Sequence, residues 1–334
     1  FAFKFNKVSR FHLICCRSSE VTSIQAKVIT RLGSSIKSRF IDPDFDTYGM
    51  LKQIREKTKK KGLPKWPLTR RIIQNDTKLS NSTVTWIGNN SSNKVVFFVH
   101  GGGYVLGLNG AHKLLANKIC KMSGSQVLIV EYRLAPEHPF PAAIEDVTEA
   151  YEYLLSHVSS ATDIVVVGES AGAGLCLSLL GRIKKAKKKM PQGAVLMSPL
   201  LDLTFSGASI ISHADRDPFL NPNMLNAVAK FYCGSQTASN TEISPLFGDL
   251  AGYPPLLVQV GSEEILFDDA TRLVQLSKKQ GVSAELEVWP GMFHSFQTMI
   301  FILPEAKKGA MELLNMSEEY LNFYANHFGQ YPWI

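Results

Sequence analysis

The amino-acid sequence predicts an α/β protein whose mostly parallel central sheet is flanked by helices on both faces. Short apolar runs typical of buried strands alternate along the chain with longer segments of helical periodicity. Such alternation is typical of parallel strands joined by helical crossovers. The expected strands are 72–75, 84–87, 95–99, 126–131, 164–167, 194–197, 255–260 and 284–288. The expected helices are 111–122, 142–158, the segment after residue 170, 268–280 and 304–327.

Two segments depart from this alternation. Residues 200–245 are rich in Asp, Ser, Asn and Pro, contain one helical patch at 224–232, and are too long for a simple connection. Residues 1–62 show helical periodicity, and four of their apolar residues fall on one face of a predicted helix: Ile24, Val28, Ile29 and Leu32. We expect 1–62 and 200–245 to form a helical cap on a core made of 63–199 and 246–334.

A glycine-flanked serine stands where a buried strand becomes a helix. The sequence Gly-Glu-Ser-Ala-Gly at residues 168–172 follows the strand at 164–167 and precedes a Leu-rich helix. In this context the motif indicates a nucleophile elbow, a strained turn that presents Ser170 at a helix N-terminus, where negative charge is favoured. An ordinary glycine-rich turn is the alternative interpretation. The context favours a nucleophilic serine.

A second glycine-rich segment suits the same chemistry. His-Gly-Gly-Gly-Tyr at residues 100–104 follows the apolar strand at 95–99. Glycines after a strand let backbone N–H groups face a cavity, and with the N–H that follows Ser170 they can hold a negatively charged oxygen. Neither Gly-x-Gly-x-x-Gly nor a following Lys-Ser/Thr is present, so a nucleotide-binding loop is not expected.

Three motifs, in this order along the chain, closely resemble those of the hormone-sensitive-lipase-like family. They are His-Gly-Gly-Gly-Tyr at 100–104, Tyr-Arg-Leu-Ala-Pro-Glu-His-Pro-Phe-Pro-Ala-Ala at 132–143, and Gly-Glu-Ser-Ala-Gly at 168–172. The resemblance spans roughly residues 70–330. It implies the α/β-hydrolase fold with a helical cap.

The resemblance also assigns roles to residues around the glycine loop. It implies that the N–H groups of Gly102, Gly103 and Ala171 form an oxyanion hole. It implies that His100 and Asp146 support that loop and do not react.

The nucleophile requires a general base, and in this fold the base follows the serine and the acid. Three histidines come after Ser170, but His213 lies in the expected cap and His327 on the last predicted helix. His294 stands in a loop after the strand at 284–288, at the position of the family's histidine. We therefore predict that His294 is the general base.

The acid is expected in the loop after the strand at 255–260. In the family it stands four residues before a retained Asp, which places it at Glu264 and makes Asp268 a helix N-cap. Glu263 is the second candidate. A carboxylate in this role orients the imidazole and stabilises the imidazolium.

These residues predict a serine carboxylesterase that forms an acyl-enzyme at a Ser-His-Glu triad and uses no metal or organic cofactor. The resemblance implies a preference for short- to medium-chain esters. The substrate pocket is expected beside Glu169, with Tyr104 near its mouth. Two alternatives stay open: a steryl or arylacetamide deacetylase of the endoplasmic reticulum, and a catalytically idle small-molecule receptor on the same scaffold.

Composition limits the partners. Of the 334 residues 45% are hydrophobic, which suffices for a large core, and 36 basic against 29 acidic side chains give a formal net charge of +7. The lysine runs at 57–61 and 184–189 contain no aromatic residues, and the second suits a helix C-terminus, so no nucleic-acid partner is expected. The sequence does not decide between a monomer and a homodimer.

Cysteine usage and targeting signals leave the location open. The number of cysteines is odd and their spacing fits no metal site: Cys15, Cys16, Cys120, Cys176 and Cys233. No apolar run is long enough to cross a bilayer. The chain begins with Phe1 and contains Asn-x-Ser/Thr sequons, so the sequence is compatible with the cytoplasm or, given an upstream signal or anchor, with the endoplasmic reticulum lumen. Membrane association is likewise left open.

Overall fold

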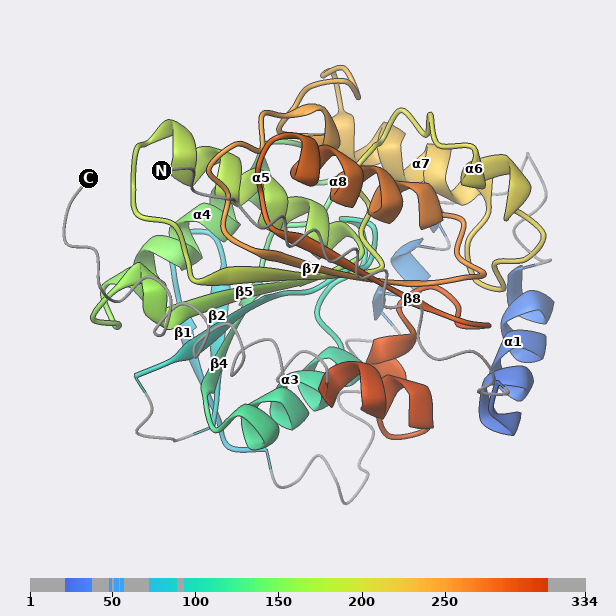
Figure 1. Ribbon diagram of the computed structural model, residues 1–334, viewed down its shortest axis with the longest axis horizontal. Helices are drawn as coiled ribbons and strands as arrows, with labels where there is room; N and C mark the ends of the chain where they lie inside the picture. The colour runs from blue at the N-terminus through green and yellow to red at the C-terminus, as the bar shows by residue number, and fades with distance from the viewer. Residues whose placement is uncertain are drawn as a thin grey trace, which may run out of the picture.

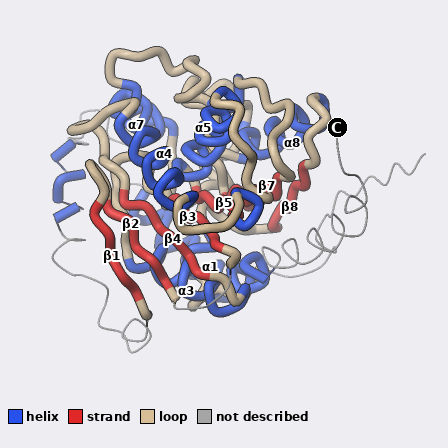
Figure 2. Tube along the Cα trace, turned by 90° about the vertical axis from the view of Figure 1, so that its left-hand side faces the viewer, coloured by secondary structure: helices blue, strands red, loops and turns tan. Residues whose placement is uncertain are grey.

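A computed structural model describes residues 22–37, 48–49, 51–53, 55–56, 72–88 and 93–311. Its centre is one twisted eight-stranded sheet in the order β1-β2-β4-β3-β5-β6-β7-β8 (Figures 1 and 2). β1 and β2 are antiparallel to their neighbours, and the other strands run parallel to one another. The strands are β1 (Gln74–Lys78), β2 (Thr83–Ile87), β3 (Val95–Val99), β4 (Gln126–Glu131), β5 (Ile164–Glu169), β6 (Gly193–Met197), β7 (Leu256–Gly261) and β8 (Ala284–Trp289).

Helices cover both faces of the sheet. α4 (Ala142–Leu155), α5 (Ala171–Lys185) and α8 (Phe267–Lys279) lie on one face, and α3 (Gly110–Ser123) lies on the other together with the short η5 (Phe296–Met299) (Figure 1). Near the carboxyl ends of the parallel strands lie α1 (Ile24–Lys37), α6 (Ser209–Ser212) and α7 (Pro222–Cys233). Residues 304–311 are also helical. Three single turns complete the list: η3 (Ala161–Asp163), η4 (Pro245–Phe247) and η5.

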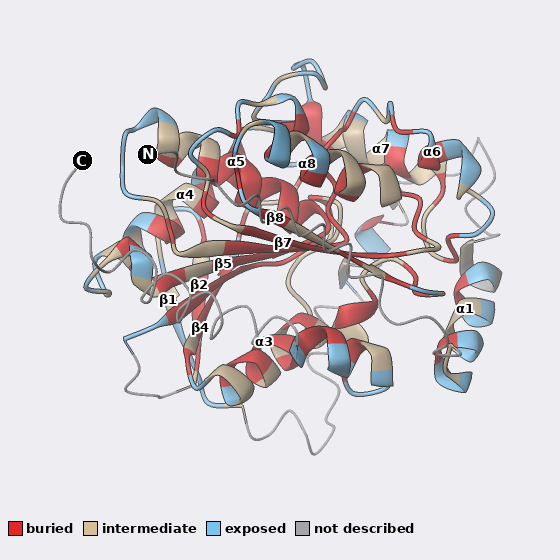
Figure 3. Ribbon diagram, in the orientation of Figure 1, coloured by how far each residue is buried: buried red, intermediate tan, exposed pale blue. Residues whose placement is uncertain are grey.

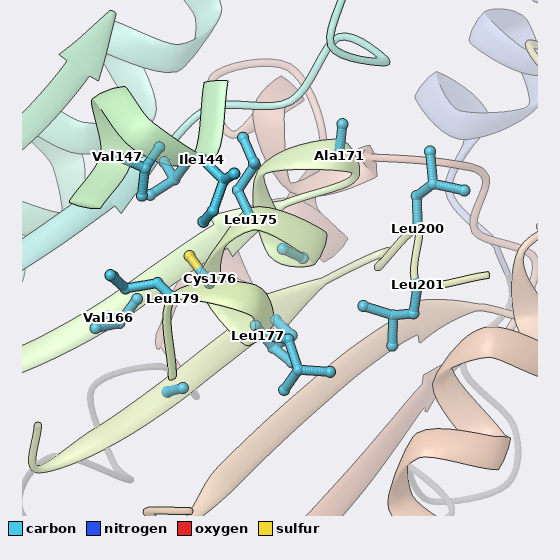
Figure 4. Close-up of a cluster of buried hydrophobic side chains, with 14 of the residues drawn as sticks. Ile144, Val147, Val166, Ala171, Leu175, Cys176, Leu177, Leu179, Leu200 and Leu201 are labelled. Carbon is cyan, nitrogen blue, oxygen red and sulfur yellow. The ribbon is translucent and has the colours of Figure 1, made fainter. Parts of the chain in front are cut away.

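The core has two parts, one on each face of the sheet. All five residues of β3 are buried, as a strand covered on both sides requires (Figure 3). On the α5 side, Leu175 and Leu179 of α5 meet Ile144 and Val147 of α4 and Val166 of β5 (Figure 4). This packing fixes the start of α5, where Ser170 stands, against the middle of the sheet.

The predicted α/β architecture is confirmed, with small differences at the ends of elements. The expected strand at 72–75 is found at Gln74–Lys78, and the helix expected at 142–158 ends at Leu155. The patch predicted at 224–232 lies within α7. Of the helix expected at 304–327, residues 304–311 are helical and the rest lie outside the described residues.

Two detailed expectations need correction. Asp268 is not the N-cap of α8, because the helix begins one residue earlier at Phe267; Asp268 instead accepts a 3.0 Å hydrogen bond from the amide of Ser209. In α1, Ile24, Val28 and Leu32 are exposed, whereas Ile29 is partly buried and packs on the core with the buried Ala26, so the four apolar residues expected on one face are divided. Among the described residues no helix is both long and apolar enough to cross a bilayer.

Candidate active site

Ser170 occupies a sharp turn between β5 and α5. Its backbone angles, φ 52° and ψ −120°, lie in a region that L-residues rarely adopt. The turn runs against the end of β3, since a Cβ atom on Gly172 would lie 2.2 Å from the carbonyl oxygen of Val99. Only glycine fits there. The predicted strand, turn and helix are all present, and they place Ser170 at the N-terminus of α5.

The imidazole of His294 lies between Ser170 and Glu264. Its Nε2 is 2.9 Å from Oγ of Ser170, and its Nδ1 is 3.0 Å from Oε2 of Glu264. Ser170 follows β5, Glu264 follows β7 and His294 follows β8. These three strands belong to the parallel part of the sheet. Because parallel strands end at the same edge of a sheet, loops far apart in sequence meet there. The residues predicted as nucleophile, base and acid are thus in one hydrogen-bonded row.

The two adjacent glutamates face different surroundings. Glu264 is fully buried, and its Oε1 accepts hydrogen bonds from the amide of Gly261 at 2.6 Å and from Oγ of Ser198 at 2.7 Å. Glu263 is partly exposed and forms a 2.9 Å ion pair with Arg216. Of the two candidate acids, only Glu264 contacts His294.

Charges around His294 raise its pKa above the usual value. Burial by itself lowers the pKa, whereas the hydrogen bond and the negative charge of Glu264 raise it, and together with other nearby carboxylates they outweigh burial. The carboxylates of Asp217 and Glu169 act in the same direction as Glu264. The site therefore favours the imidazolium, the form that His294 takes when it has accepted a proton from the serine.

The glycine loop faces the same site. Gly102 and Gly103 have φ values of 105° and 60°, which favour glycine, and both line the cavity at Ser170. Within the described residues, no acceptor is hydrogen bonded to the amide of Gly102, Gly103 or Ala171. Backbone donors without an acceptor near the candidate nucleophile Ser170 suit a developing oxyanion.

The residues expected to support this loop differ in how directly they do so. His100 stacks on Tyr132 with ring centroids 4.3 Å apart, and the hydroxyl of Tyr132 donates to the carbonyl oxygen of His100 at 2.9 Å. Asp146 contacts Arg133, accepting from its backbone amide at 2.8 Å and from its guanidinium at 2.7 Å. Its link to the glycine loop is indirect, through the segment that begins at Arg133.

Tyr104 is not at the mouth of the pocket, where it was expected. Its side chain is 1% exposed and stacks on Tyr232 with centroids 3.7 Å apart. Its hydroxyl lies against α5, because a Cβ atom on Gly174 would be 2.7 Å from it. The neighbouring residues Gly103 and Val105 form the cavity wall instead.

Glu169 does line the cavity, within a network that the sequence analysis missed. Its carboxylate accepts a hydrogen bond from Oγ of Ser295 and lies 3.4 Å from Nε2 of His112. Burial favours the neutral acid, but His112, His294 and Ser295 lower the pKa of Glu169 to about 2. His112 also completes a capping box with Asn109 at the start of α3, which fixes the position of its ring.

A cavity of about 480 Å³ opens at Ser170. Segment 200–245 supplies much of its wall, and Leu51 comes from the helical residues near 50. The wall from this segment is apolar: Phe219, Leu220, Met224, Leu225, Ala227, Val228 and Phe231. The polar side chains of the lining, besides Ser170 and His294, include those of Asn109, His112, Glu169 and Ser295. The cavity therefore joins an apolar wall to the candidate nucleophile.

No group of three or more His, Cys, Asp or Glu side chains within the described residues is placed to hold a metal ion. Three of the five cysteines are described, and all three are buried: Cys120, Cys176 and Cys233. Cys15 and Cys16 lie outside the described residues.

Comparison with known proteins identifies the family to which the chain belongs. A family model for the alpha/beta hydrolase fold, Abhydrolase_3, matches residues 96–298, more than half of the chain. The chain belongs to this family. An esterase of Acinetobacter venetianus is 38% identical, over 67% of this chain and 74% of its own length. An acetyl-hydrolase of Streptomyces hygroscopicus is 39% identical, over 64% of this chain and 72% of its own length.

Solved structures of family members are also similar to this hydrolase. A crystal structure of an esterase from the bacterial hormone-sensitive lipase family has a TM-score of 0.80 and 33% identity, covering 89% of this chain and 98% of that one. The esterase EstE5, in crystals soaked with p-nitrophenyl butyrate, has a TM-score of 0.81 and 30% identity, covering 89% of this chain and 99% of its own. The present hydrolase is therefore a carboxylic ester hydrolase of the hormone-sensitive-lipase-like group.

Proposed function

We propose that this esterase hydrolyses short- to medium-chain carboxylic esters through an acyl-enzyme on Ser170. The observation that carries the proposal is the continuous row from Ser170 through His294 to Glu264, with contacts of 2.9 and 3.0 Å. A serine hydroxyl is a weak nucleophile until a base within hydrogen-bond reach can take its proton. His294 is such a base, and Glu264 holds its tautomer and stabilises the imidazolium.

The reaction proceeds in two halves. As Oγ of Ser170 attacks the ester carbonyl, its proton moves to Nε2 of His294, and the carbonyl oxygen becomes negative. The amides of Gly102, Gly103 and Ala171 stabilise that oxygen. When the tetrahedral intermediate collapses, the bond to the alcohol oxygen breaks and His294 gives its proton to the leaving alcohol.

The second half releases the acid. Water attacks the acyl-enzyme while His294 takes one of its protons, and the same amides hold the second oxyanion. Collapse breaks the bond to Oγ of Ser170, which recovers its proton from His294. The carboxylic acid then leaves through the cavity.

Cavity size and lining support the substrate class. A volume of about 480 Å³ is in the range of small-ligand pockets, and its apolar wall suits an acyl chain. We propose that residues 200–245, together with the helical residues of 1–62, form a cap that sets chain length. The similar EstE5 was soaked with p-nitrophenyl butyrate, a short-chain ester.

A second substrate class shares the chemistry. Two similar proteins are called acetyl-hydrolase and putative acetyl-hydrolase, which points to acetate esters of larger alcohols. Such substrates would place the small acetyl group in the site and the alcohol along the apolar wall.

Turnover of p-nitrophenyl esters from acetate to palmitate, with Ser170→Ala as control, tests the proposal. We expect activity that is highest with short chains and absent from Ser170→Ala. A protein that is folded but inactive on every ester, including acetate esters of bulky alcohols, would contradict it. Equal activity of Ser170→Ala and wild type would contradict the assignment of the nucleophile.

A further inference from the structure

The hydroxyl of Ser198 lies between the candidate acid and the loop of the candidate base. Ser198 directly follows β6, and its side chain is fully buried. Its Oγ donates a 2.7 Å hydrogen bond to Oε1 of Glu264 and accepts a 3.1 Å hydrogen bond from the amide of Ser295. One hydroxyl group therefore contacts both the acid and the residue next to His294.

The backbone of Ser198 does not account for a serine at this position. Its φ of 49° lies in the left-handed region, which favours glycine over any residue with a side chain. Its amide donates to the carbonyl oxygen of Gln259 at 2.7 Å, so the main chain is already held by β7. Glycine would satisfy both requirements. What serine adds is the hydroxyl and its two hydrogen bonds.

Both partners depend on that hydroxyl. Without it, Oε1 of Glu264 would keep only the amide of Gly261 as donor, although the carboxylate is fully buried. The amide of Ser295 would lose its acceptor, and Ser295 also has a left-handed backbone, with φ 58°. A left-handed residue keeps its conformation only when surrounding contacts hold it.

We propose that Ser198 is a positioning residue that fixes the Glu264 carboxylate and the main chain after His294 relative to each other. The proposal rests on the proposed function, in which Glu264 and His294 act on Ser170. Ser198 touches none of the reacting atoms. It acts by keeping Oε2 of Glu264 directed at Nδ1 of His294 while the loop keeps Nε2 directed at Ser170.

The test compares Ser198→Ala and Ser198→Gly with Ser178→Ala. Ser178 is a matched control because it is also a buried serine, whose hydroxyl donates to the carbonyl oxygen of Glu242 at 2.9 Å, outside the site. With p-nitrophenyl acetate we expect kcat to fall about tenfold or more in both Ser198 variants, because each loses a hydrogen bond to a charged group. KM should stay within about twofold of wild type, because Ser198 does not contact the substrate. Ser178→Ala should keep the kcat of the wild type.

Two further readouts separate positioning from a structural role. The acid limb of the kcat/KM profile should move to lower pH in the Ser198 variants. The reason is that the Glu264 carboxylate, no longer held against His294, raises the pKa of His294 less. Asp217 and Glu169 also raise this pKa, and the substitutions leave both of them in place. In a Glu264→Gln background, Ser198→Ala should have little further effect on kcat, because residues that act as a unit are non-additive.

Several results would overturn the proposal. They are an unchanged kcat and acid limb, full activity of Ser198→Gly, or an undiminished effect of Ser198→Ala in the Glu264→Gln background. Ser198→Gly removes the Cβ atom that makes a left-handed backbone unfavourable, so this variant should fold even where Ser198→Ala does not. Failure of both to fold would make the hydroxyl a folding requirement and would also overturn the proposal. Wild-type activity and the Ser170→Ala control decide the proposed function separately.

Discussion

Oε2 of Glu264 lies 3.0 Å from Nδ1 of His294, while the adjacent Glu263 forms an ion pair with Arg216. Two neighbouring carboxylates of the same chemical type thus have different environments, one fully buried and one partly exposed. The ends of two neighbouring strands cause this difference, because the amide of Gly261 at the end of β7 and the hydroxyl of Ser198 after β6 hold the buried carboxylate. The difference makes the identity of the acid testable.

Glu264→Gln should lower kcat by about three to four orders of magnitude, because an amide cannot stabilise the imidazolium and can hold the wrong tautomer of His294. Glu263→Gln, the matched control, should stay within about threefold of wild type, since an exposed ion pair contributes little. Steady-state hydrolysis of p-nitrophenyl acetate measures both. The reverse order of effects would place the acid at Glu263.

The pH dependence follows from the raised pKa of His294. His294 must be neutral to accept the serine proton, so kcat/KM should fall as the pH drops through its pKa in the free enzyme. Because Glu264 raises that pKa, the midpoint of the acid limb should lie above the ordinary histidine value of about 6.5. Glu264→Gln should move the midpoint down. Profiles of kcat/KM between about pH 5 and pH 9 measure this; a wild-type midpoint below the ordinary value would contradict it.

Asp146 should matter for stability far more than its neighbour Glu145. The Asp146 side chain is 1% exposed and is bonded to Arg133, whereas that of Glu145 is 54% exposed and lies 3.4 Å from the same guanidinium. We expect Asp146→Ala to lower the free energy of unfolding by about 3 kcal/mol, because it removes one partner of a largely buried ion pair. Glu145→Ala should cost about 0.5 kcal/mol or less. Urea unfolding distinguishes these outcomes, and equal losses would argue against the role of burial.

Lys37 of α1 should influence substrate preference without taking part in the reaction. Its ammonium group donates to the carbonyl oxygens of Ala214 and Asp217, in the segment that leads to the cavity-lining residues Phe219 and Leu220. Lys37→Met should loosen this wall and raise activity on octanoate relative to acetate, with a loss of about 1 kcal/mol in stability.

Lys27→Met is the matched control, because Lys27 is an exposed residue of the same helix. It should change neither the ratio of the two activities nor the unfolding free energy. An unchanged ratio in Lys37→Met would mean that α1 does not help to shape the cavity.

Local sequence patterns were sufficient to predict the alternation of strands and helices and the turn at Ser170. An apolar run such as 164–167 encodes a buried strand by itself, and the glycines around Ser170 encode a close approach of backbone. The same patterns could not predict which side of α1 is buried. Ile24, Val28 and Leu32 form an apolar face in the sequence, yet the packing of α1 buries Ala26.

The sequence by itself determined the serine motif and the glycine loop, because each is a short motif placed directly after a strand, and it predicted His294 from its order in the chain and the family resemblance. Only the tertiary structure decided that Glu264 is buried and faces His294, that Tyr104 is buried against Tyr232, and that Ser198 bridges the loops after β7 and β8. These relationships depend on neighbours in space that are far apart in the chain, such as Ser198 and Ser295 or Tyr104 and Tyr232. Local periodicity carries no information on which side chains the ends of parallel strands bring together.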